Sequence, residues 1–243
     1  MNHKHWITTE WPAPASVHAA TTLRTGGVSF GAFNSLNAAL HVGDNAEFVR
    51  QNRTIIKEML DLPGEPVWLE QIHSNKAVDA ANSGLLQQAD ASYTDKPGVI
   101  CAVMTADCLP VLVCASEGSQ VAAIHAGWRG LLTGVIGNTL AEIASHDVLV
   151  WLGPAIGPDC FEVGDDVRDA FLLKSTAFST AFKARGKGKW LADIYQLARI
   201  DLAALGVHKI YGGTFCTVTE QERFYSYRRD KETGRMVTLI WRD

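Results

Sequence analysis

Residues 99–128 have the sequence VICAVMTADCLPVLVCASEGSQVAAIHAGW, and this stretch decides the fold. Three apolar runs alternate in it with short polar turns: Val99–Met104, Val111–Cys114 and Val121–Ile124. Apolar runs of this length, rich in β-branched residues, predict buried strands. Because Cys108 precedes the second run and His125 follows the third, we expect the strands to carry a thiol and an imidazole to the ends of a sheet.

His73 extends this group, since it also follows an apolar run, Val67–Leu69. One thiolate and two imidazoles leave one position open around a tetrahedral zinc ion, which is the arrangement of a catalytic zinc site. A bound water then has a pKa near about 7 and becomes a usable nucleophile. The spacing is wide and irregular, so spacing alone favours this site no more than a buried Cys beside hydrogen-bonded His side chains. What favours the metal is the small-residue turn Ala126–Gly127 directly after His125.

The composition and charge exclude several classes of protein. With 243 residues, 47% of them hydrophobic and 20% charged, the chain can bury a large core. A net charge of −4 gives no electrostatic basis for binding nucleic acid. No apolar stretch approaches the ~18–20 residues of a membrane helix, and the polar segment Met1–Glu10 lacks the apolar core of a signal peptide. Five cysteines, an odd count without a Cys-x-x-Cys motif, predict free thiols and a cytoplasmic location.

Helical and extended patterns mix along the chain without strict βαβ alternation. We therefore predict an α+β fold, a single domain of residues 1–243 built on mixed β-sheets with flanking helices. The patterns predict further strands over Pro66–His73, Val148–Leu152, Lys209–Gly212 and Met236–Trp241. They predict helices over Asp44–Leu60, Gly130–Ala144, Val163–Leu173 and Leu191–Leu205, and an exposed loop over Lys183–Lys189. Asp44 and Glu47 have the spacing of a capping box for the first helix.

Two positively charged segments are candidates for binding an anion. The turn Gly127–Gly130 opens a predicted helix, whose free N–H groups suit a phosphate together with Arg129. Arg228 and Arg229 supply further positive charge later in the chain. For Arg229, a plain surface ion pair with Asp230 is an equally good interpretation.

These segments resemble the signature blocks of the laccase-domain family, whose members are also called purine nucleoside phosphorylase, polyphenol oxidase or peptidoglycan editing factor. The three main blocks are Leu69–His73, Thr105–Pro110 and His125–Gly130. Further blocks are Arg24–Gly27, Ser35–Asn37, His41–Asn45, Gly153–Gly157 and Ser226–Asp230. Together the blocks extend in order over nearly the whole chain. Ser74, where the family often has Gly, is a departure that leaves the expected ligands intact.

The resemblance implies a single-domain α+β fold and a zinc ion held by His73, Cys108 and His125. It also implies phosphorolysis of adenosine, inosine, guanosine and S-methyl-5′-thioadenosine to the base plus the ribose 1-phosphate, and hydrolytic deamination of adenosine. Purine nucleosides and phosphate are then the partners, and Asp107 joins the three ligands as a catalytic residue that carries a proton. We expect the substrate- and phosphate-binding residues to be Arg24, Asn37, Arg129 and Arg228.

Three other functions use the same residues. Cys108 could be the nucleophile of a metal-free hydrolase that acts on a cell-wall precursor, with His125 or His73 as its base. A zinc-stabilised module could instead bind a nucleotide or such a precursor without turnover. Copper-dependent oxidation of polyphenols is the weakest alternative, because a multicopper centre needs many paired His and its type 1 copper needs clustered Cys, His and Met. The chain has eight His, and its one His-x-His pair, His3 and His5, lies at the terminus.

Overall fold

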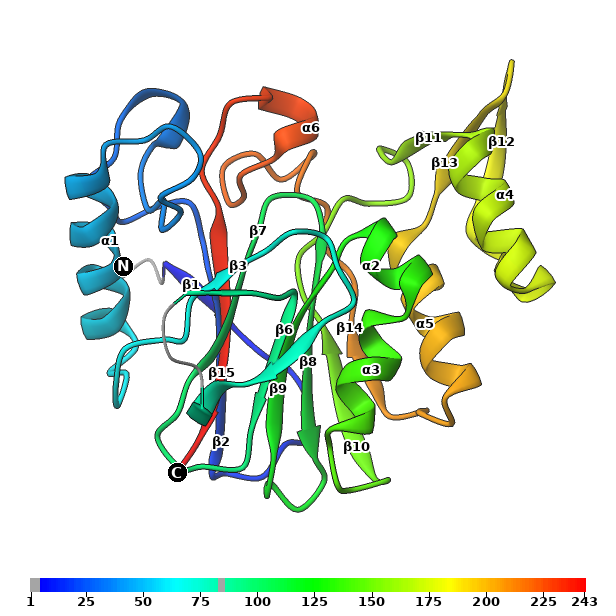
Figure 1. Cartoon of the computed structure of the whole chain (residues 1–243). Helices are drawn as coiled ribbons and strands as arrows, with labels where there is room; N and C mark the ends of the chain where they lie inside the picture. The colour runs from blue at the N-terminus through cyan, green and yellow to red at the C-terminus, as the bar shows by residue number, and fades with distance from the viewer. Residues whose placement is uncertain (1–4, 83–85) are drawn as a thin grey trace.

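The computed structural model describes residues 5–82 and 86–243. They form two face-to-face β-sheets with helices on both outer sides (Figure 1). The first sheet is antiparallel, in the order β1 (Trp6–Thr8), β2 (Val17–Thr22), β15 (Met236–Arg242) and β7 (Cys101–Thr105). The second has the order β14 (Ile210–Gly212), β10 (Val148–Leu152), β8 (Leu109–Ala115), β9 (Val121–Ala126), β6 (Ala91–Thr94) and β4 (Ala77–Asp79). In this second sheet β14 and β4 run parallel to their neighbours and the other pairs are antiparallel, so the predicted α+β fold with mixed sheets is confirmed.

Helices cover the outer face of each sheet. Helix α1 (Ala46–Met59) lies on the first sheet, and α2 (Trp128–Thr133), α3 (Val135–Ala141) and α5 (Ile194–Ala204) lie on the second (Figure 1). Beside α5, helix α4 (Asp165–Lys174) packs on a small sheet of β11 (Glu162–Gly164), β13 (Lys189–Ala192) and β12 (Phe182–Gly186). The short elements are β3 (Leu69–Glu70), β5 (Gln87–Gln88), α6 (Tyr227–Asp230) and the 3₁₀ turns Gly31–Phe33, Ala80–Asn82 and Thr176–Ala181.

Alternation along the central strands separates two cores. Side chains of successive strand residues point to opposite faces of a sheet. In β8, Leu112 and Cys114 therefore pack between the two sheets, whereas Val111 and Val113 pack against the helices. All four are fully buried, which explains why the sequence shows a continuous apolar run instead of an alternating one.

Most predicted elements are present, but several bounds are wrong. The helix over Gly130–Ala144 is two helices, because Gly134 adopts φ +90° between them. The loop over Lys183–Lys189 is the β12–β13 hairpin, whose exposed polar side chains hid the strand pattern. The two later helices begin after short strands, at Asp165 and at Ile194.

The capping box of the first helix is also wrong. Asn45 is the N-cap, and its side chain accepts a hydrogen bond from the Glu47 amide. The Asp44 carboxylate is occupied elsewhere, since it accepts hydrogen bonds from Ser29 Oγ and Asn37 Nδ2.

The five cysteines are all free thiols. Among the described residues, no helix combines the length and apolar character needed to cross a bilayer.

Candidate metal centre

Three elements bring His73, Cys108 and His125 together at one end of the second sheet. His73 follows β3, Cys108 lies in the turn between β7 and β8, and His125 is the fifth residue of β9. The antiparallel register pairs Pro110 with His125, so the turn that carries Cys108 lies beside His125. The three ligand atoms all lie within 4.8 Å of one another, and Cys108 Sγ is 3.9 Å from His73 Nε2.

This arrangement fits a zinc ion. Tetrahedral bonds of about 2.0 Å to nitrogen and about 2.3 Å to sulfur separate the ligand atoms by about 3.5 Å. The distance of 3.9 Å between Cys108 Sγ and His73 Nε2 is close to that value. The two imidazole rings lie at 72° with their centroids 4.9 Å apart, so both can turn a nitrogen to one point. Across residues 5–82 and 86–243, this is the one group of three or more His, Cys, Asp or Glu side chains with such a spacing.

Asp90 holds both histidine-bearing segments in place. Its carboxylate is fully buried and accepts hydrogen bonds from His125 Nδ1 at 2.7 Å and from the backbone N–H of His73 at 3.0 Å. It also accepts from the amides of Ile72 and Ser74 and from Ser74 Oγ. Metal-bound histidines usually donate their second ring N–H to a carboxylate in this way, which fixes the tautomer and the orientation of the ring.

The same hydrogen bonds explain why the predicted strand over Pro66–His73 shrinks to Leu69–Glu70. The amides of residues 72–74 donate to Asp90 instead of to a neighbouring strand. His73 adopts φ +59°, a backbone conformation that few residues other than Gly, Asn and Asp adopt. The chain therefore turns at His73 and presents the imidazole to Cys108.

The backbone of Gly127 lies directly against Cys108, His73 and His125. A Cβ at this position would lie 3.1 Å from Cys108 Sγ and 3.2 Å from His73 Cδ2. Since contacts of this length are tighter than nine in ten real ones, a side chain here would push Cys108 and His73 away by a few tenths of an ångström. The glycine in the turn after His125 is thus explained by the close approach of the backbone to the three ligands.

The electrostatics of the group favour a thiolate. Burial disfavours the charged form of Cys108, but the charge of His125 and hydrogen bonds from both imidazoles outweigh it and lower the pKa of Cys108 to about 6. Burial also opposes the charge of His125, yet the Cys108 thiolate and the Asp90 carboxylate together raise the pKa of His125. The thiolate is the form of Cys that binds metals and attacks electrophiles.

Two cavities meet at the ligands. One, here called the Trp128 cavity, has a volume of about 250 Å³ and an apolar wall of Trp128, Ile156, Phe161 and Ile194. Its polar side chains are Asp107, Arg129 and Arg228. The other, the Arg235 cavity, has a volume of about 320 Å³ and is lined by His41, Gln71, Thr105 and Arg235. His73, Ala106, Cys108 and Tyr227 line both.

Of the predicted site residues, six lie in these cavities. His73, Cys108 and His125 are joined by Asp107, whose carboxylate accepts hydrogen bonds from Thr217 Oγ1 and from the Arg228 amide, each at 2.6 Å. The Arg228 guanidinium donates to two backbone carbonyls, and the exposed Arg129 guanidinium stacks on the Trp128 ring. The turn Gly127–Gly130, predicted to bind an anion at the start of a helix, opens α2, which has only six residues.

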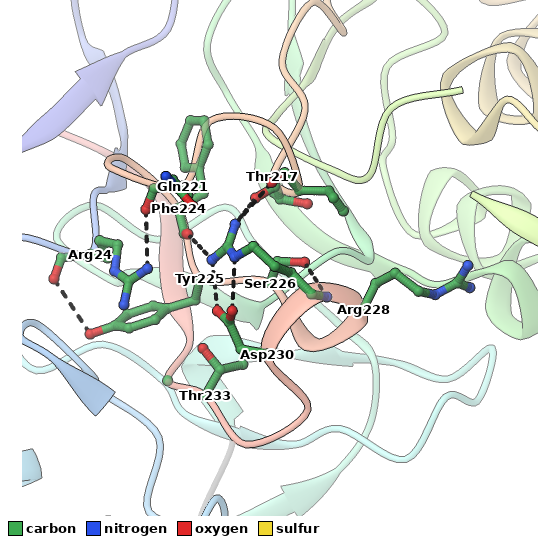
Figure 2. Close-up of polar contacts among 12 residues, drawn as sticks. Arg24, Thr217, Gln221, Phe224, Tyr225, Ser226, Arg228, Asp230 and Thr233 are labelled. Atoms are coloured by element: carbon green, nitrogen blue, oxygen red, sulfur yellow. Dashed lines mark hydrogen bonds and ion pairs between the residues drawn. The ribbon is translucent and has the colours of Figure 1, made fainter. Parts of the chain in front are cut away.

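Arg24 and Asn37 lie apart from the three ligands. The Arg24 guanidinium lies over the Tyr225 ring and donates a hydrogen bond to the Gln221 carbonyl (Figure 2). The Arg228 side chain points away from these residues. Arg24 lines a third, larger cavity, and Asn37 is fully buried, with both ends of its amide hydrogen-bonded. Their role in binding substrate stays a prediction. Arg229 forms the predicted ion pair with Asp230 at 2.7 Å.

Sequence reasoning missed Asp90, His41 and Arg235. An acidic residue inside an apolar segment, as in Ala89–Tyr93, was an available signal for Asp90, because a buried carboxylate needs partners. His41 belongs to a block that resembled the family, but Arg235 lies outside every such block and had no local signal.

Known proteins match this chain over nearly its full length. Residues 18–243 match the family described as multi-copper polyphenol oxidoreductase laccase. The chain is 51% identical to the Escherichia coli protein named purine nucleoside phosphorylase YfiH, over 97% of this chain and 98% of that protein. It is 49% identical to a Pseudomonas aeruginosa protein also named purine nucleoside phosphorylase, with the same coverage.

Solved structures agree with this match. A crystal structure of a Neisseria meningitidis protein, 53% identical, superposes with a TM-score of 0.96 over 99% of this chain and all of that one. YlmD from Geobacillus stearothermophilus, 33% identical, superposes with a TM-score of 0.91 over 100% of this chain and 97% of that one. Fold, sequence blocks and family match agree, so this chain belongs to the multi-copper polyphenol oxidoreductase laccase family.

Proposed function

We propose that residues 1–243 form one zinc-dependent purine nucleoside phosphorylase domain. It converts adenosine, inosine, guanosine and S-methyl-5′-thioadenosine to the base plus the ribose or methylthioribose 1-phosphate, and it deaminates adenosine hydrolytically. The observation that carries the proposal is the junction of the two cavities at His73, Cys108 and His125. The names of the relatives add support for a nucleoside and a phosphate as substrates.

Zinc is the proposed metal, with copper the less favoured one. One thiolate and two imidazoles with an open fourth position match a catalytic zinc site, and the carboxylate behind His125 completes it. When bound, the ion would supply a Lewis acid and acidify a water. Five free thiols further support a reducing, cytoplasmic setting.

The Trp128 cavity suits a purine. Its wall of one indole, one phenyl ring and two isoleucines offers the flat apolar faces that a base stacks on. Arg129 and Arg228 are then candidates for contacts with the nucleoside. Both oxygens of Asp107 accept hydrogen bonds that hold the side chain in place, and Asp107 would take a proton from water and pass it to the leaving ammonia during deamination.

Phosphate-dependent release of adenine tests the main activity. Adenosine incubated with the metal-loaded protein should give adenine and ribose 1-phosphate only when phosphate is present, and inosine and ammonia without it. Chromatography of the products measures both reactions. A protein with intact zinc that releases no base from any of the four nucleosides would contradict the phosphorylase.

A metal-free Cys–His hydrolase is the second candidate, and the lowered pKa of Cys108 favours it. We expect Cys108 of chelator-treated protein to react with iodoacetamide at pH 7 far faster than Cys101 and Cys114, because burial raises the pKa of both of these to about 12. Peptide mass spectrometry measures the modification. Zinc should protect Cys108; a protein that is fully active without metal and inactivated by alkylation would favour the hydrolase instead.

A further inference from the structure

We propose that the Arg235 cavity is the phosphate subsite, where an oxyanion accepts hydrogen bonds from the Arg235 guanidinium, the His41 imidazole and the Thr105 hydroxyl beside the metal ligands. The inference rests on the proposed function and deepens it, since it assigns the phosphate to residues different from Arg129 and Arg228.

The Arg235 guanidinium has N–H groups available for a ligand. Its Nη1 donates to the carbonyls of Thr233 and Gly234, each at 2.9 Å. Within the described part of the chain, Nε and Nη2 donate no hydrogen bond and the guanidinium forms no ion pair. The backbone is held as well, because the Arg235 amide donates to Asn37 Oδ1 at 3.0 Å. A half-buried guanidinium fixed at one nitrogen and open at two is suited to a bidentate oxyanion.

Thr105 gives an independent sign of a ligand. Its side chain is only 2% exposed, and its hydroxyl has no hydrogen-bond partner among residues 5–82 and 86–243. Buried hydroxyls are rarely left without a partner in native proteins. Since Thr105 lines the Arg235 cavity, an oxygen-rich ligand there would supply the partner.

His41 lines the same cavity as Arg235. Partial burial lowers the pKa of His41 first, and the charges of Arg235 and Arg53 lower it further, against the charge of Glu70, which raises it. The lowered pKa favours the neutral imidazole, which can donate one N–H to an anion without adding a charge.

The two cavities differ in charge. The Trp128 cavity contains the Asp107 carboxylate, which repels an anion. The Arg235 cavity contains no carboxylate among its lining residues. The Cys108 thiolate lines both cavities, so the Asp107 carboxylate is the difference in charge, and repulsion between like charges in a low dielectric then favours the Arg235 cavity for phosphate.

The arrangement also suits the reaction. In phosphorolysis a phosphate oxygen forms a bond to C1′ of the ribose while the bond from C1′ to the purine nitrogen breaks. The purine leaves with the bonding electron pair and takes up a proton. Attack and departure on opposite sides of C1′ require two compartments with the ribose between them, and the two cavities meet at His73, Ala106, Cys108 and Tyr227.

Inorganic phosphate is the probe for the test. We expect Arg235→Met in the metal-loaded protein to weaken phosphate binding in titration calorimetry on the order of 10- to 100-fold, the loss typical of a charged hydrogen-bonding partner. The KM for phosphate should rise in parallel, with the KM for adenosine changed less than about threefold. Arg235→Lys should restore part of the affinity. Arg50→Met, which removes an exposed arginine of α1, is the matched control and should change neither value.

Two further variants keep the test decisive if Arg235→Met fails to fold. Thr105→Val replaces the orphan hydroxyl with a methyl group of the same shape, and His41→Phe removes the N–H while keeping a ring. Each should weaken phosphate binding several-fold. Unchanged binding in both, or loss of binding in Arg129→Met instead, would overturn the subsite.

The outcomes separate this inference from the proposed function. Arg235-dependent phosphate binding in a protein that cleaves no nucleoside would uphold the anion subsite and refute the phosphorylase. Active phosphorolysis with an unchanged KM for phosphate in Arg235→Met would uphold the phosphorylase and refute the subsite.

Discussion

A Cys108→Ala substitution is expected to release the metal and to lower phosphorolysis on the order of 100-fold or more. Four-ligand zinc sites bind with about 10–16 kcal/mol, so each ligand accounts for roughly 3 kcal/mol, or about two powers of ten in affinity. The loss should be at the upper end here, because Cys108 is the one anionic ligand of the three. Metal analysis of protein purified without chelator and an assay of adenine release measure the two effects.

Cys114→Ala is the control for this substitution. Cys114 lies in β8, the strand that follows Cys108, but its thiol is fully buried between the two sheets and does not belong to the group of His73, Cys108 and His125. Its removal should lower stability modestly and leave metal content and activity unchanged. If Cys108→Ala instead kept a full equivalent of zinc and wild-type turnover, the metal centre would have to lie elsewhere.

The sequence predicted that Cys108 and His125 lie at the ends of sheet strands, and the structure brings them together with His73. The three apolar runs within residues 99–124 show which strands are buried. The ends of neighbouring buried strands lie close together at one edge of the sheet. Cys108 and His125 are brought together by nothing more than the β8–β9 register. The central strands, the flanking helices and the mixed sheets could be predicted for the same reason.

The surroundings of the ligands could not be predicted in this way. Asp90 contacts His125 across 35 positions, and Arg235 lines one cavity with Cys108 across 127 positions, through contacts that no local pattern encodes. His73 also breaks a local rule, since its φ of +59° ends a strand that its apolar neighbours would continue. The hydrogen bond from the His73 amide to Asp90 helps to hold His73 in this conformation. The strand therefore ends at His73 because of Asp90, a residue 17 positions further along the chain.

An Asp90→Asn substitution should produce the second large effect. The carboxylate accepts five hydrogen bonds, with both oxygens acting only as acceptors. An amide offers one acceptor and turns an NH₂ group toward donors, which leaves buried N–H groups without partners. Breaking a buried charged pair costs about 3–5 kcal/mol, and loss of the carboxylate behind a metal-bound histidine costs about 10- to 100-fold in metal affinity. Urea unfolding of metal-free protein and zinc titration separate the two losses.

Asp95→Asn makes the same change at an exposed position and is the matched control. Asp95 pairs with Lys96 at 3.2 Å on the surface, where such pairs contribute about 0–1 kcal/mol. It should change neither unfolding nor zinc affinity. Ser74→Ala should lie between the two, because it removes one of the five donors and leaves the carboxylate in place.

The stability difference between wild type and Asp90→Asn should depend on pH with a definite sign. Burial works against the Asp90 carboxylate, but hydrogen bonds from His125 and Ser74 outweigh it and lower its pKa to about 2. A carboxyl group whose pKa is lower in the folded state stabilises the fold fully above its unfolded pKa of about 3.9, and this stabilisation disappears as pH falls through the folded value. In metal-free protein the two unfolding free energies should therefore differ most above pH 5 and converge as the pH approaches 2. A difference that stayed constant over this range would mean that Asp90 acts through its shape and not through its charge.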